Sequence, residues 1–139
     1  MLQPEDFFNL SETRFKDLFD NIEYVWDALK GIRNYIDKHI EPNVSGLRKS
    51  GVLINKTMVL HNGDIIESGF DISVSGRKTA VKKDGAILES ASIIYAGAVL
   101  MDDNIQIGKG TVIESGVLIK GPAIIGDNTE LRQGAYLRG

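Results

Sequence analysis

Residues 101–139 read MDDNIQ IGKGTV IESGVL IKGPAI IGDNTE LRQGAY LRG when they are divided into groups of six. The first position of every group is apolar, and these residues are Met101, Ile107, Ile113, Ile119, Ile125, Leu131 and Leu137. The fourth position is always a turn former, and these residues are Asn104, Gly110, Gly116, Pro122, Asn128 and Gly134. The fifth position is always small or β-branched. Three columns that agree in this way indicate a six-residue repeat.

A unit of six residues has room for one short strand and one corner, and it cannot bury its two apolar side chains alone. Stacking such units into a coil turns both side chains inward and produces a continuous core. The same frame extends back over residues 95–100, and before that it slips by two residues. We therefore expect the regular coil to begin near Ile87 and to occupy residues 87–139.

The first 43 residues have a different pattern, because their apolar residues recur at helical spacing. Over residues 7–40 they fall at steps of three and four, which predicts a helical segment with one apolar stripe. Ser11 is the expected N-cap and Pro42 is expected to stop the helix, while the Asp20-Asn21 pair offers a point of division into two helices. We interpret the stripe as a core-facing surface. A helix dedicated to binding a partner is the alternative.

Residues 44–86 are typical of short strands joined by turns. Asn62-Gly63 lies between two apolar runs, and this dipeptide is the strongest short signal for a β-hairpin. Ser75-Gly76 and Asp84-Gly85 predict two further turns. The sequence thus divides into an N-terminal helical segment (1–43), a short-strand β connector (44–86), with an irregular first layer of the coil as its alternative, and a coiled repeat (87–139).

Composition excludes several classes of protein. The chain has 139 residues, a net charge of −3 and no cysteine, so disulfides and thiolate chemistry are excluded and a nucleic-acid partner is disfavoured. No apolar run is long enough for a membrane span, and the acidic start does not resemble a secretory signal. We find no metal-binding motif. We therefore expect a cytoplasmic protein without a membrane span and without a metal site.

Hexads with Ile or Leu first and a small residue fifth resemble those of the left-handed parallel β-helix proteins, the hexapeptide-repeat acyltransferases and nucleotidyltransferases. The stretch Ile119–Gly139, IKGPAIIGDNTELRQGAYLRG, is similar to the sugar-nucleotide branch of this family. That branch includes the β-helix of the N-acetylglucosamine-1-phosphate uridylyltransferase/glucosamine-1-phosphate acetyltransferase enzymes and stand-alone lipid A acyltransferase-like proteins. The segments Phe7–Leu10 and Tyr24–Leu29 are similar to the helical preface of the stand-alone members.

The resemblance implies a homotrimer of prisms in which each coil contains three hexads, so that residues eighteen apart stack. Leu100, Leu118 and Tyr136 would then form an outward apolar stripe, covered either by the N-terminal helix or by a trimer contact. Outward charges would stack as well. We expect Asp102, Lys120 and Arg138 to form one ladder and Glu114 and Arg132 to form another, both solvated.

The resemblance also implies a function: transfer of an acyl group, with acetyl as the expected one, from coenzyme A to an amino sugar or nucleotide sugar. In the family, coenzyme A lies in a groove between neighbouring prisms, and Lys120, Arg132 and Arg138 are the candidates for binding its phosphates. The alternatives are a sugar-1-phosphate nucleotidyltransferase-related protein and a catalytically inactive β-helical trimerisation module.

Family acyltransferases use a histidine as general base, but His39 and His61 both lie outside the hexads. We expect both to be structural, and the sequence assigns no catalytic residue. The chain stops half a hexad into a coil, at Leu137–Gly139, whereas family members continue for several coils. We therefore expect a truncated β-helix.

Overall fold

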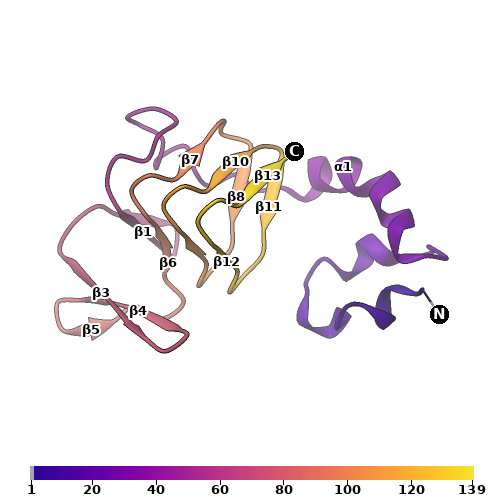
Figure 1. Cartoon of the computed structure of the whole chain (residues 1–139), viewed down its shortest axis with the longest axis horizontal. Coiled ribbons are helices and arrows are strands. Elements are labelled where there is room, and N and C mark those ends of the chain that lie inside the picture. Colours follow the sequence, from indigo (N-terminus) through magenta and orange to yellow (C-terminus); the bar gives the residue numbers. More distant parts are fainter. Residues whose placement is uncertain (1) are drawn as a thin grey trace. The chain divides into compact units, whose positions relative to one another are not determined.

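The structure is a computed structural model that describes residues 2–139. The chain divides into two compact units, of which the first ends at His39 and the second covers Ile40–Gly139. Most of the regular structure is β, and the described residues contain one α-helix (Figure 1).

The first unit is helical but contains no long helix. Its elements are the 3-10 helices η1 (Pro4–Asp6), η2 (Leu10–Glu12), η3 (Lys16–Phe19) and η4 (Val25–Asp27), and the α-helix α1 (Ala28–His39). The predicted helix over residues 7–40 is therefore correct only in its last third. Asn21 has a positive φ of 60°, which breaks the segment at the predicted point. The cap of η2 is Asn9 and not Ser11, since the Asn9 side chain accepts a hydrogen bond from the Ser11 amide.

Aromatic contacts hold the first unit together. The Phe15 and Tyr35 ring centroids are 6.3 Å apart, and the Tyr35 and His39 rings stack at 4.1 Å. The Tyr35 hydroxyl donates a hydrogen bond to the Asp17 carboxylate. Burial, followed by this hydrogen bond, raises the pKa of Tyr35 to about 12. Among the described residues of this unit, only Pro4 and Ala28 are buried, so the unit has no core of its own.

The repeat region consists of short strands separated by corners. These strands are β6 (Ser92–Ile94), β7 (Val99–Leu100), β8 (Ile105–Ile107), β9 (Val112–Ile113), β10 (Leu118–Lys120), β11 (Ala123–Ile125), β12 (Glu130–Leu131) and β13 (Tyr136–Arg138). Each strand pairs in parallel with the third strand after it, giving the series β6–β9–β12, β7–β10–β13 and β8–β11. Leu118 pairs with Tyr136 at a separation of eighteen residues, as expected for stacked coils of three hexads.

The first coil departs from the predicted frame. Ile119 pairs with Leu100, nineteen residues away, and Leu100 is fully buried, whereas the side chain of Met101 is 42% exposed. The predicted inward position of Met101 and outward position of Leu100 are therefore wrong. The corner between β7 and β8 contains one residue more than a hexad allows. Arg48 holds this corner: its Nε donates to the Leu100 carbonyl at 2.8 Å and its guanidinium pairs with Asp103.

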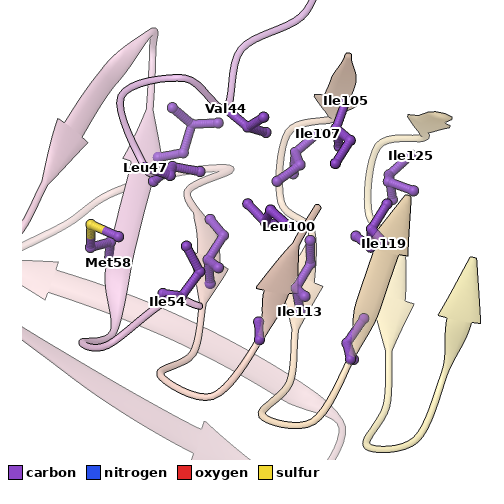
Figure 2. Packing of buried hydrophobic residues seen from close by; sticks show 14 of the residues in the cluster. Val44, Leu47, Ile54, Met58, Leu100, Ile105, Ile107, Ile113, Ile119 and Ile125 are labelled. Atoms are coloured by element: carbon purple, nitrogen blue, oxygen red, sulfur yellow. The ribbon is translucent and has the colours of Figure 1, made fainter. Parts of the chain in front are cut away.

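Two inward columns of side chains form the core (Figure 2). The buried members of the first column are Ile94, Leu100, Ile107, Ile113, Ile119 and Ile125. The buried members of the second are Ser92, Ala98, Ile105, Thr111, Val117 and Ala123. The two hydroxyls of the second column connect successive coils. Ser92 Oγ accepts a hydrogen bond from the Thr111 amide, and Thr111 Oγ1 accepts one from the Thr129 amide.

Residues 40–66 close the first coil. The strand β1 (Met58–His61) pairs antiparallel with β6, Leu53 forms an antiparallel bridge with Val99, and the Asn43 side chain makes two hydrogen bonds with the Ile107 backbone. The edges of β6, β7 and β8 are therefore all covered. Beside the first coil, the buried side chains of Val44, Leu47, Ile54 and Met58 continue the core (Figure 2). Residues 40–66 thus form a cap, which removes exposed strand edges.

The three predicted turns of the connector are confirmed. Asn62-Gly63 joins β1 to β2 (Asp64–Ile66), and both residues have positive φ, as a type I′ turn requires. The other two turns join β3 (Phe70–Ser75), β4 (Lys78–Lys83) and β5 (Ala86–Ile87) into an antiparallel sheet. Ile87, where the coil was expected to begin, pairs antiparallel with Lys82, so parallel pairing begins only at β6.

Candidate functional site

The predicted cations do not all come together. Lys120 and Arg138 are direct register partners on β10 and β13, so their exposed side chains lie on adjacent coils. Arg132 follows β12, which belongs to a different sheet, and its guanidinium pairs with Glu130 at 3.2 Å. Within residues 2–139, no ion pair joins Lys120 or Arg138 to a carboxylate. Lys120 and Arg138 are therefore two exposed cations on adjacent coils, with no ion-pair partner in the described part of the chain.

The predicted charge ladders form only in part. Asp102 does not pair with Lys120, because its carboxylate accepts the amides of Asn104 and Gly121, both at 2.9 Å. Glu114 likewise accepts the amide of Gln133 at 2.9 Å. These carboxylates satisfy backbone donors at the corners of the coil. The Asp102 and Glu114 carboxylates therefore have a structural role at these corners.

An apolar row lies beside the cation pair. It consists of Leu53, Val99, Leu118 and Tyr136, which follow one another in register across the sheet. Tyr136 is 61% exposed and Leu53 is 54% exposed. The predicted stripe therefore exists, with Val99 in the place that was expected for Leu100. Its neighbours Lys120 and Arg138 give one side of the row a basic border.

A groove of about 360 Å³, which sequence reasoning missed, lies on the outer side of the β6–β9–β12 sheet. Its lining residues are Val74, Thr79, Tyr95, Val112, Glu114, Ser115, Glu130 and Gln133. The β3–β4 hairpin supplies one wall and the coils supply the rest. Val81 of this hairpin packs with Val59 and Ile93, which fixes the hairpin on the sheet. Val74, Tyr95 and Val112 supply its apolar surface, and the other lining side chains are polar.

The two histidines lie outside the parallel strands, as the sequence indicates. His39 stacks on Tyr35 in the first unit. His61 lies at the end of β1, with Nε2 3.1 Å from the Glu89 carbonyl oxygen. Residues 2–139 contain no group of three or more His, Asp and Glu side chains that could hold a metal ion. Nor does this part of the chain contain a helix with the length and apolarity needed to cross a bilayer.

Stacked hexads with glycines at several corners are the defining feature of residues 104–139. Residues 104–139 match the family of bacterial transferase hexapeptide domains (six repeats). The match begins at Asn104, the last residue of the irregular corner, and covers the regular hexads that follow. A search of the curated proteins and of the solved structures finds no match to the chain.

Proposed function

We propose that the second unit is a left-handed parallel β-helix of the hexapeptide transferase type. The observation that carries this proposal is the agreement between the family match over residues 104–139 and the parallel pairing of strands at eighteen-residue separation. Proteins with hexapeptide repeats commonly form trimers, and we propose a homotrimer and a cytoplasmic location for this protein. We also propose that it belongs to the sugar-nucleotide branch.

The proposed reaction is transfer of an acetyl or other acyl group from coenzyme A to an amino sugar or nucleotide sugar. The acceptor amine or hydroxyl attacks the thioester carbonyl, the carbon–sulfur bond breaks, and the acceptor loses its proton to a base as the thiol leaves. Lys120 and Arg138 support this proposal, because two adjacent cations without carboxylate partners suit phosphate groups. Arg132 supports it less, since Glu130 already pairs with its guanidinium.

The groove beside the β3–β4 hairpin is the place that we propose for the acceptor. Tyr95 and Val112 offer apolar surface to a sugar ring, while Glu114 and Gln133 offer hydrogen-bonding groups to its hydroxyls. A sugar-1-phosphate nucleotidyltransferase-related protein is a second reading of the same family match. A catalytically inactive trimerisation module is the third, and one observation favours it: neither histidine lies in the coils, so no imidazole base is at hand there.

Calorimetric titration of the full chain with acetyl-coenzyme A tests the proposed carrier site. We expect saturable binding that the double variant Lys120→Ala/Arg138→Ala weakens by about tenfold or more, because charge-assisted contacts to phosphate are lost. Lys109→Ala, which removes an exposed cation elsewhere on the coils, should bind as the parent does. Absence of heat at millimolar ligand would count against the enzyme and for the structural module.

A further inference from the structure

The groove beside the β3–β4 hairpin has charge of one sign only. Of its eight lining residues, Glu114 and Glu130 are acidic and none is basic. On the hairpin wall Lys78 precedes Thr79, but side chains alternate along a strand, so Lys78 is on the opposite face of β4 from the groove. A ligand in the groove therefore meets carboxylates and no cation among the lining side chains.

The parallel ladder places the two carboxylates on adjacent coils. Val112 is the register partner of Glu130, and Glu114 follows Val112 by two residues and lines the same groove. The Tyr95 amide donates to the Ile113 carbonyl at 2.9 Å, so Tyr95 lies one coil away from Glu114 on the other side. An aromatic ring, an aliphatic side chain and two carboxylates are thus brought together on three neighbouring coils.

The two carboxylates differ in how far their charge is compensated. Glu130 pairs with the Arg132 guanidinium at 3.2 Å. Glu114 Oε2 accepts the Gln133 amide at 2.9 Å, and within residues 2–139 no cationic side chain forms an ion pair with Glu114. Glu114 is also half-buried, whereas Glu130 is exposed. Glu114 is therefore the group whose negative charge is left for a ligand in the groove.

These groups suit an ammonium ion and not a phosphate. A carboxylate binds an ammonium group by a charge-assisted hydrogen bond, and the face of an aromatic ring such as that of Tyr95 attracts the same group. A phosphate in this groove would instead meet two carboxylates, and like charges weaken binding. Lys120 and Arg138, the candidates for binding phosphate, lie on a different sheet of the coils. The second unit thus separates its uncompensated charges by sign.

We infer that the groove binds a small organic ammonium compound without a phosphate group. The ammonium group lies against Glu114, and the carbon skeleton lies on Tyr95 and Val112. The inference rests on the proposed function, which places the acceptor in this groove, and it narrows that acceptor to an amine whose charge is recognised. Glu114 is in this role a specificity-determining residue.

Three related sugars test the charge requirement. Glucosamine has an ammonium group, N-acetylglucosamine replaces it with a neutral amide, and glucosamine-6-phosphate adds a phosphate. In NMR titrations of the isotope-labelled full chain, glucosamine should bind about fivefold or more tightly than either of the others, and the amide resonances of Val112 and Glu114 should shift. Equal affinities for glucosamine and N-acetylglucosamine, tighter binding of the phosphate, or no binding of glucosamine would overturn the inference.

A conservative variant isolates the charge of Glu114. In Glu114→Gln the side-chain amide oxygen can still accept the Gln133 amide, so the corner of the coil is retained. This variant should bind glucosamine and N-acetylglucosamine with equal affinity. Glu89→Gln, which changes an exposed carboxylate outside the groove, should keep the preference of the parent. A preference for glucosamine that persists in Glu114→Gln would contradict the role of this carboxylate.

Titration of the same protein with acetyl-coenzyme A separates this inference from the proposed function. Binding of acetyl-coenzyme A without a preference for glucosamine would support the carrier site and overturn the amine site. A preference for glucosamine without binding of acetyl-coenzyme A would count against acyl transfer and support the amine site.

Discussion

At the residue scale, the fold depends on which of two adjacent apolar side chains turns inward. Leu100 and Met101 are neighbours in the sequence, and hexad arithmetic places Met101 in the core. The structure places Leu100 there, in register with Ile119, because the corner that follows contains an extra residue. Arg48 satisfies the Leu100 carbonyl at this corner and is itself mostly buried, with a side chain only 16% exposed. Arg48 thus stabilises the corner at which the repeat takes seven residues instead of six.

A pair of alanine substitutions tests this frame. Leu100→Ala should lower the free energy of unfolding by about 2–5 kcal/mol, because it removes a fully buried side chain and leaves a cavity. Met101→Ala should change it by no more than about 0.5 kcal/mol, because Met101 is on the surface. Urea titration monitored by circular dichroism measures both. A larger loss of unfolding free energy for Met101→Ala than for Leu100→Ala would place Met101 in the core, as the regular six-residue frame does. That result would contradict the structure.

At the scale of the element, successive coils are connected by more than their parallel ladders. Ser92, Thr111 and Thr129 occupy equivalent corners, and each of the first two hydroxyls accepts the amide of the next. The Thr111 hydroxyl also donates to the Gly126 carbonyl at 2.8 Å. A side chain of the same shape without the hydroxyl would fill the column equally well. The specific contribution of the hydroxyl is therefore its hydrogen bonding and not its volume.

Thr111→Val should therefore be destabilising although it preserves shape. It leaves the Thr129 amide without its partner in a half-buried corner, which costs about 1–3 kcal/mol. Thr129→Val is the matched control, because the Gly126 carbonyl that it ceases to bond still accepts from Thr111. We expect the control to lose less than about 1 kcal/mol. Equal losses in the two variants, measured by thermal denaturation, would rule out the proposed role of the ladder.

At the scale of the whole molecule, the sequence predicts local periodicity well and long-range placement poorly. The columns, the three turns of residues 44–86 and the adjacency of Lys120 and Arg138 follow from spacing, because each depends on a repeat or a short motif. The position of Arg132 on another sheet also follows from the period, since it precedes Arg138 by one hexad and not by three. The extra corner residue was not predictable, because Arg48, which stabilises it, lies about fifty residues away.

The groove and the cap are further cases of tertiary placement. The groove is made by residues from the β3–β4 hairpin and from three different coils, and no spacing brings these together. The cap arises because Asn43 and β1 pair with strand edges far along the chain. The N-terminal helix was overpredicted for a related reason. Its apolar spacing fits long helices on both sides of the break at Asn21, but the residues before Ala28 form only short 3-10 helices.

The two compact units differ so much in burial that they should unfold in separate steps. The second unit contains a continuous core, whereas the described residues of the first bury only Pro4 and Ala28. Regions with few buried contacts open at lower free energy than the core of the same protein. Trp26 is the single tryptophan and lies in the first unit, so its fluorescence reports on that unit alone.

In urea, the Trp26 transition should have a midpoint lower by about 1 M or more than the loss of β-strand circular dichroism. Coincident transitions in the parent would show that both units unfold cooperatively and would contradict this prediction.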